Sequence, residues 1–342
     1  MKFITEALNL TGEFRELSAA VKNGKTPAVV TGVSGIHKCT IAYGLAKAHQ
    51  RKLLVLSAEE GESTRFAEDL RSMGLSCVLY PLRDFSLRDT AGNSHEYERQ
   101  RLEALNRLAR GDCDCVLCTI DAALQRTIPK KELIARGLAI ATAQELSTDK
   151  LLAALYSCGY QRAEQIDGTG QFSHRGGIID FFPPGMENPV RIEFWGDEID
   201  SISYFDLETQ RRGEQIPSVT ITPSVEVLPK SPSLLSKKIE ALEKQLRGKH
   251  AAKAKEILED ERKKIEAGIH IGSMDKFISL VYDEPSTLFD YFAPEDSLLV
   301  FSEGSSLKEK IRTTLWQWGE DIKDYFEEGV LCRGLDTFSE DW

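Results

Sequence analysis

The chain has 342 residues, of which 41% are hydrophobic and 28% charged, and its formal net charge at pH 7 is −11. This length suffices for two or three domains with a substantial core, and the composition is typical of globular proteins. The acidic balance argues against autonomous binding to nucleic acid, because phosphate contacts need a basic surface. The sequence has no run of about 18 apolar residues and no apolar signal-peptide core, so we expect a cytoplasmic protein without membrane contact.

Residues 1–127 alternate amphipathic and apolar segments, which predicts a parallel α/β sheet of the RecA-like type. In chain order the expected elements are a helix ending near Lys22, a strand at 28–31, a helix to Gln50, a strand at 53–57, a helix at 63–73, a strand at 77–80, a helix at 101–110 and a strand at 116–121. Asp121 is expected to be the N-cap of a helix at 122–127. Ala122 and Ala123 stand where an ATPase of this fold would need a catalytic glutamate.

Residues 29–45, VVTGVSGIHKCTIAYGL, have the strand, turn and helix context of a phosphate-binding loop. The candidate loop positions are Gly32, Gly35, His37, Lys38 and Cys39. Against the pattern G-x-x-x-x-G-K-[ST], Gly32 and Lys38 match, but His37 replaces the second glycine and Cys39 the hydroxyl residue. A Cβ at a left-handed position is strained, and sulfur is a poor ligand for magnesium. The sequence therefore favours a degenerate loop that does not bind ATP over a working one.

Residues 84–100, DFSLRDTAGNSHEYERQ, contain one Phe and one Tyr among several acids. Proteins that grip single-stranded nucleic acid need several stacking aromatics and basic residues. We expect an ordinary surface loop here.

Residues 129–141 are expected to form a connection and 148–157 a short amphipathic helix, followed by a small antiparallel sheet to about Pro229. Along residues 190–195, alternation sends Ile192 and Phe194 to one face. The other face receives Arg191, Glu193 and Trp195. The sheet is thus predicted to have a packed face and a free, arginine-bearing face.

The preceding strand, around residues 171–175, shows the same alternation of buried and exposed positions. Phe172 is expected to be buried, whereas Gln171, Ser173 and Arg175 are expected to be exposed. Gly176 and Gly177 then allow backbone bends. Residues 183–185 end the strand, 196–197 form a turn, and 199–205 form the next strand.

RGGIIDFFPPG followed by RIEFWGDEID resembles the second domain shared by UvrB and the transcription-repair coupling factor. The resemblance is unbroken from Gly159 to about Arg212 and weaker over the rest of the chain. In both families this domain docks the damage sensor UvrA. Gly177, where UvrB-type sequences usually carry Asp, and the degenerate loop favour the coupling factor. A short segment at 84–100 stands where UvrB inserts its long aromatic hairpin.

The resemblance implies a UvrA-docking patch made of Arg162, Arg175, Arg191, Glu193, Trp195 and Asp197. Parity independently supports Arg175, Arg191 and Trp195 on one face. Read from the residues alone, the two arginines would be ordinary surface charge on a solvated sheet. No residue is expected to act in catalysis or to ligate a metal.

The resemblance also implies the domain organisation. Residues 1–127 and 230–342 would form a degenerate RecA/P-loop-like domain, with 128–229 inserted as a small, mainly antiparallel α+β domain. The chain would be a non-catalytic N-terminal module that recruits UvrA to stalled RNA polymerase; the alternative is a UvrB-like ATP-dependent repair enzyme. RNA polymerase, duplex DNA, ATP and magnesium would be partners and cofactors of a longer protein, with no cofactor and little DNA binding for this chain.

Residues 236–266 are highly charged, with apolar residues at helical spacing. Their Lys and Arg residues could contact DNA, or they could form Glu–Lys pairs on a solvent-exposed helix face. The acids interleaved among them favour the second interpretation. Further strands are expected at 277–282, 287–289 and 297–301.

Seven cysteines are scattered along the chain, and Cys113, Cys115 and Cys118 form C-x-C-x-x-C. No second cysteine or histidine pair with zinc-site spacing lies nearby. Buried free thiols are therefore favoured over zinc ligands.

Overall fold

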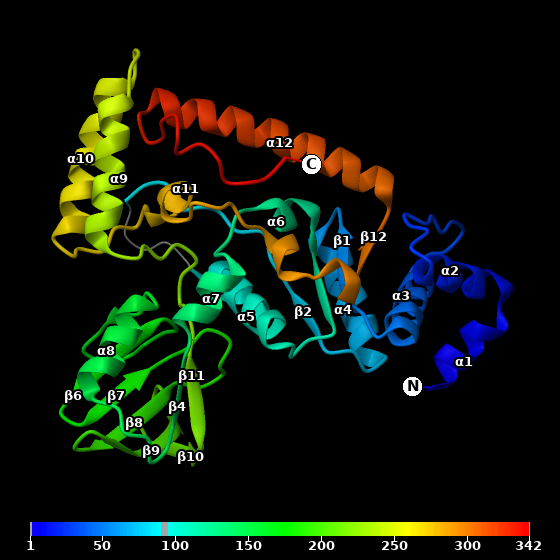
Figure 1. Ribbon diagram of the computed structural model, residues 1–342, viewed down its shortest axis with the longest axis horizontal. Helices are drawn as coiled ribbons and strands as arrows, with labels where there is room; N and C mark the ends of the chain where they lie inside the picture. Colours follow the sequence, from blue (N-terminus) through cyan, green and yellow to red (C-terminus); the bar gives the residue numbers. More distant parts are fainter. Residues whose placement is uncertain (1, 90–94, 342) are drawn as a thin grey trace.

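The structure is a computed structural model that describes residues 2–89 and 95–341, so residues 90–94 of the predicted loop at 84–100 lie outside the described part. A parallel α/β unit lies beside an antiparallel domain, and a helical hairpin stands above that domain, as Figure 1 shows. The fold is thus of the α/β class, with separate parallel and antiparallel sheets. Within the described ranges, no helix is both long and apolar enough to cross a membrane.

The first sheet joins strands from both halves of the chain. Its order is β12–β1–β3–β2, all parallel, with bounds Ser297–Phe301, Lys52–Ser57, Cys115–Thr119 and Cys77–Leu79. The helices of this first part are α1 (Lys2–Leu10), α2 (Gly12–Lys22), α3 (Ile36–His49), α4 (Glu60–Ser72), α5 (Glu96–Arg110) and α6 (Ile120–Leu124).

Helices cover both faces of this sheet, which is why its central strands are apolar throughout. Leu53 and Val55 face the core that contains α3 and α4. Leu54 and Leu56 face the core that contains α5 and α6. All seven cysteines are buried free thiols, as expected for Cys113, Cys115 and Cys118.

The strand expected at 28–31 is wrong. This segment has no regular structure, and Val29 is 86% exposed. Both hydrogen-bonding edges of β1 are taken, by β12 and β3. Gly32 and Gly35 have φ values of 77° and 49°, so the chain turns sharply before α3 begins.

Two further expectations are corrected. Asp121 is not a helix N-cap, because α6 begins at Ile120 and its N-cap is Thr119. The strands expected at 277–282 and 287–289 are helical: η1 (Met274–Phe277), α11 (Ile278–Val281) and η2 (Leu288–Tyr291). At η2, the side chains of Thr287 and Asp290 form a reciprocal capping box that favours a helical turn over a strand.

The antiparallel domain contains a six-stranded sheet in the order β10–β9–β8–β7–β6–β5, in which the short β5–β6 pair is parallel. The bounds are β5 (Gln161–Arg162), β6 (Gln171–Arg175), β7 (Ile178–Phe181), β8 (Val190–Trp195), β9 (Glu198–Phe205) and β10 (Arg212–Gln215). A two-stranded sheet pairs β4 (Leu138–Ala141) with β11 (Ser218–Ile221), and the helix of this domain is α8 (Thr148–Ser157). α7 (Lys130–Arg136) precedes β4 and packs through Leu133 in the core of the α/β unit.

Helix α8 spans the residues predicted for it and covers one face of the six-stranded sheet. Ser147 accepts a hydrogen bond from the Lys150 amide and so caps its N-terminus. Leu151 and Leu155 pack with Phe172 in a core that leaves the opposite sheet face outside.

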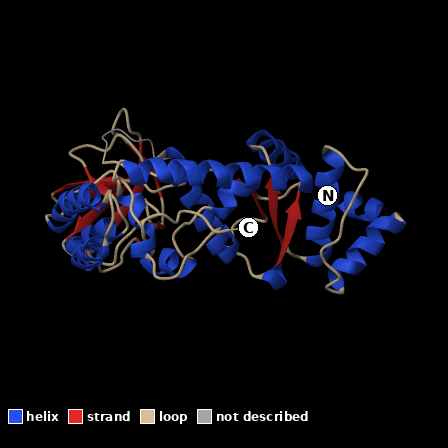
Figure 2. Ribbon diagram, turned by 90° about the horizontal axis from the view of Figure 1, so that it is seen from above, coloured by secondary structure: helices blue, strands red, loops and turns tan. Residues whose placement is uncertain are grey.

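The C-terminal part adds a helical hairpin and a long helix. α9 (Pro232–Gln245) and α10 (Ala251–Glu266) pack side by side, and η3 (Pro294–Asp296) precedes β12. α12 (Gly304–Glu327) then crosses the molecule from β12 toward the hairpin, as Figure 2 shows from above. Lys310 of α12 pairs with the buried Asp121 carboxylate at 3.2 Å, so Asp121 anchors this helix.

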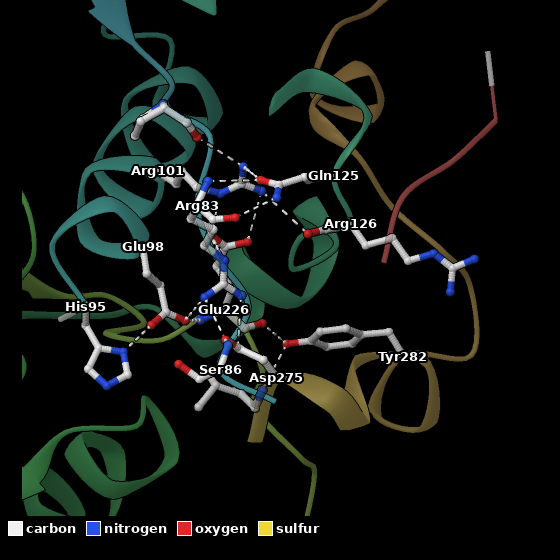
Figure 3. A network of polar contacts seen from close by, with 12 residues as sticks. Arg83, Ser86, His95, Glu98, Arg101, Gln125, Arg126, Glu226, Asp275 and Tyr282 are labelled. Atoms are coloured by element: carbon white, nitrogen blue, oxygen red, sulfur yellow. Dashed lines mark hydrogen bonds and ion pairs between the residues drawn. The ribbon is translucent and has the colours of Figure 1, made fainter. Parts of the chain in front are cut away.

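A buried ion network connects the three parts of the chain (Figure 3). Arg83 contacts Asp275 at 2.9 Å, Glu98 at 3.2 Å and Glu226 at 3.4 Å. Arg101 contacts Glu226 at 2.7 Å. Since Glu226 lies at the C-terminal end of the antiparallel domain and Asp275 lies in the C-terminal part of the chain, the network fixes that domain to the α/β unit.

The network carries two guanidinium groups and three carboxylates, and His95 lies at its edge with Nδ1 2.8 Å from Glu98. Burial alone would raise the pKa of Glu98, but Arg83 and His95 outweigh it and lower that pKa to about 2. For Asp275, burial outweighs Arg83 and the pKa is raised. The hydrogen bond to Glu98 raises the pKa of His95, and protonated His95 would balance the third carboxylate.

Candidate docking face

The outer face of the six-stranded sheet is built from two rows of residues in register. One row runs across the sheet through Ser173, Asp180, Arg191 and Ser203. The next row runs through Arg175, Ile178, Glu193 and Ser201. Because cross-strand partners share a face, both rows lie opposite the core that α8 covers.

Asp180 organises the two arginines of this face. Its side chain is almost fully buried, and its two oxygens lie 2.7 and 2.9 Å from Nε and Nη2 of Arg191. Arg175 donates from Nη2 to the same carboxylate at 3.2 Å. One acid therefore holds two arginines, one of which, Arg175, keeps 56% of its side chain exposed.

Arg191 is held more tightly than the parity prediction implies. Its guanidinium lies 4.6 Å from the centre of the Phe205 ring, and only 15% of its side chain is exposed. The hydrogen bond with Asp180 raises the pKa of Arg191 against the effect of burial. Arg191 therefore presents one edge of a paired guanidinium rather than a free charge.

Glu193 is also paired across the sheet. Arg212 of β10 contacts its carboxylate at 2.7 Å, and the Ser201 hydroxyl donates to it at 3.2 Å. The expected exposure of Ser173 is wrong: it is 1% exposed although it lies on the outer row.

Trp195 and Asp197 lie at the β8–β9 turn. Gly196 has φ 63°, which permits the tight turn, and Trp195 pairs with Glu198 across it. The Asp197 carbonyl accepts from the Leu146 amide at 2.8 Å, so the turn is tied to the segment before α8. Trp195 is 82% exposed and gives this end of the face a large apolar surface.

Arg162 lies apart from the other predicted residues. It is exposed on the edge strand β5, in register with Phe172 of the core row. Two strands, β6 and β7, separate it from β8. The structure thus brings together Arg175, Arg191, Glu193 and the Trp195 turn, and places Arg162 at the other edge.

Asp180 was absent from the residues predicted for this patch. The sequence does contain a signal for Asp180. In IIDF at 178–181, alternation places it on the outer face, between two strands that carry arginines. What the sequence does not show is its burial, which results from both arginines folding over it.

Lys38, in the segment predicted to be a degenerate phosphate loop, belongs to a partly exposed ion cluster. Lys38 Nζ lies 2.5 Å from Glu303, 3.2 Å from the Ser302 hydroxyl and 3.4 Å from Glu62. Burial acts to lower the pKa of Lys38, but the hydrogen bond with Glu303 and the charge of Glu62 raise it overall. Two carboxylates thus occupy the surroundings in which a phosphate would need positive charge.

Cys39 is packed in the core that contains α3 and α4. It is 2% exposed, and its sulfur lies 3.4 Å from a carboxylate oxygen of Asp69. Burial, together with Asp69, raises the pKa of this thiol to about 12. Neither a magnesium-ligating hydroxyl nor a second loop glycine is supplied by His37 and Cys39.

Comparisons with known proteins match both the antiparallel sheet and nearly the whole chain. Residues 138–226 match the family model described as the UvrB interaction domain, and the six-stranded sheet lies within this range. The transcription-repair-coupling factor of Bacillus subtilis is 29% identical over 333 residues, which cover 94% of this chain. Those of Staphylococcus haemolyticus and Staphylococcus aureus strain MRSA252 are 26% and 25% identical over 95% and 96% of it.

The chain spans 28% of the length of these relatives. The match to the interaction domain and the similarity along nearly the whole chain confirm the resemblance read from residues 159–212. Residues 138–226 are similar to the UvrB interaction domain, and nearly the whole chain is similar to part of the bacterial transcription-repair-coupling factors.

Proposed function

We propose that this chain is a non-catalytic module that recruits UvrA to RNA polymerase stalled at DNA damage, through the outer face of its antiparallel sheet. The main support is the sheet face inside the region that matches the UvrB interaction domain. Strands β6 and β8 place four side chains on this face: Arg175, Arg191, Glu193 and Trp195. Arginine and tryptophan are the residues most often dominant in protein interfaces.

The parallel α/β unit would be a degenerate RecA-like domain that acts as a scaffold. The Lys38–Glu303 and Lys38–Glu62 contacts support this, because they neutralise the lysine that a nucleotide would need. RNA polymerase, duplex DNA and an ATP- and magnesium-dependent motor would belong to a longer cytoplasmic protein. A UvrB-like ATP-dependent enzyme remains the competing hypothesis, and the same contacts count against it.

Binding of purified UvrA to this chain in isothermal titration calorimetry tests the proposal. Saturable binding that does not depend on ATP supports recruitment by the module itself. Absence of saturable binding at tens of micromolar protein contradicts it.

A further inference from the structure

Apart from Lys237, which is exposed near the start of α9, the cations of the α9–α10 hairpin form two groups that differ in their partners. In one group each side chain has a carboxylate within 3.3 Å: Lys238, Lys244, Arg262, Lys263 and Lys264. Several of these pairs have the i, i+4 spacing expected for a solvated helix face. For this part of the hairpin, the prediction of a solvated helix face with Glu–Lys pairs is confirmed.

The second group lies at the tip of the hairpin. Residues 244–255, KQLRGKHAAKAK, contain no acid, and the loop between α9 and α10 projects beyond the rest of the molecule (Figure 1). Among the residues that the structure describes, Arg247, Lys249, Lys253 and Lys255 have no carboxylate within 4.0 Å. The first three are exposed and Lys255 is half-buried.

The tip cations are held in place by ordered neighbours. Arg247 Nη1 donates to the carbonyls of Lys244 and Leu246 at 2.7 and 2.9 Å, which fixes the guanidinium at the C-terminal end of α9. The stem of Lys253 packs so close to Gly329 that a Cβ there would lie 2.9 Å from Lys253 Cγ. Since Leu246 is also buried, the tip is an anchored surface rather than a loose loop.

We propose that this tip binds the phosphate backbone of duplex DNA without regard to sequence. Cations that gather unpaired on a protein of net charge −11 form the local basic surface that phosphate binding needs. The remaining surface is acidic on balance, so the contact is confined to the tip. This site lies outside the proposed UvrA-docking face and does not depend on it.

The residue types favour a duplex backbone over other anionic partners. Residues 244–256 contain no Trp, Tyr or Phe, so the tip offers neither the aromatic platforms that single strands stack on nor an aromatic anchor for a protein pocket. The ammonium and guanidinium groups of lysine and arginine pair with phosphate oxygens whatever the base sequence, so these side chains suit contacts with the backbone. Three to four such contacts give a slope of roughly −3 in a plot of log affinity against log salt concentration.

Fluorescence anisotropy with a labelled duplex of mixed sequence, at salt concentrations from about 50 to 200 mM, tests the proposal. The tip variant is R247E/K249E/K253E, and the control is K22E/K25E/R65E at exposed cations in the α/β unit. Three reversals change the formal net charge from −11 to −17 in both variants, so general repulsion is matched. A neutral variant, R247Q/K249Q/K253Q, serves if the reversed tip fails to fold.

We expect weak duplex binding by the wild type, roughly 10⁻⁴ to 10⁻⁶ M, that falls at least about tenfold in the tip variant and changes little in the control. Equal losses in both variants, or no loss in the tip variant, would overturn the proposal. Tighter binding to the matching single strand would overturn the duplex assignment. If polyglutamate displaces the labelled duplex as strongly as unlabelled DNA does, at equal charge concentration, the duplex assignment is wrong and an acidic protein is the better partner.

Discussion

Arg191 and Asp180 form a two-point ion pair between neighbouring strands, with N–O distances of 2.7 and 2.9 Å. The pair covers Asp180 and orients the guanidinium at the proposed docking face. In D180N, Arg191 and Arg175 lose their shared charged acceptor, so we expect a loss of about 2 kcal/mol in stability and weaker UvrA binding. Urea unfolding and calorimetry measure the two effects, and unchanged UvrA affinity in folded D180N would show that this acid has no positioning role.

The same pair makes Arg191→Glu a test of stability as well as of binding. The reversal places a second carboxylate against buried Asp180, so it should lower the thermal stability as well as UvrA binding. Arg175→Glu is the cleaner charge test, because more than half of its side chain is exposed. Thermal unfolding should fall much further in R191E than in R175E, and equal melting temperatures would contradict the ion-pair geometry.

Arg83 is expected to be the most sensitive charged residue for stability. In R83M, three buried acids lose their common partner, which should cost about 3 to 5 kcal/mol in urea unfolding. R88M is the matched control, since the Arg88–Glu328 pair is about half exposed and should contribute less than about 1 kcal/mol. Similar losses in the two variants would show that the network does not join the parts of the fold.

His95 should make part of the stability depend on pH. Its folded pKa is raised by Glu98, so its contribution is present below the unfolded value of 6.5 and is lost as pH rises through the folded pKa. The destabilisation in H95Q should therefore be larger at pH 5.5 than at pH 8.5. Urea unfolding of wild type and H95Q at both pH values measures it, and a pH-independent difference would mean that His95 stays neutral.

The degenerate loop should not bind nucleotide. We expect no saturable ATP–Mg²⁺ binding in calorimetry. Lys38 already forms ion pairs with Glu62 and Glu303, and the buried Cys39 supplies no hydroxyl for magnesium. Lys38→Ala should change stability by less than about 1 kcal/mol, since its ion pairs are partly exposed. A micromolar dissociation constant that is lost in Lys38→Ala would favour the enzyme hypothesis instead.

The sequence predicts those elements whose cause is local. The spacing at 148–157 predicts α8, and alternation at 190–195 predicts the two faces of β8. The strand at 28–31 fails although its residues are apolar: the central strand β1 is already paired on both sides, by β12 and β3, and local apolar character does not reveal this pairing. The ion network is likewise invisible in sequence, because Arg83 and Asp275 are 192 positions apart.

Trp195→Ala tests the docking proposal most directly. Trp195 is 82% exposed, so its removal should leave thermal unfolding nearly unchanged while weakening UvrA binding by at least about 2 kcal/mol, the scale of an interface hot spot. Trp316→Ala is the matched control, since Trp316 is 64% exposed on α12, away from the sheet. Calorimetry with purified UvrA should show the loss in W195A and wild-type affinity in W316A. If folded W195A binds UvrA as tightly as the wild type does, this face is not the docking site.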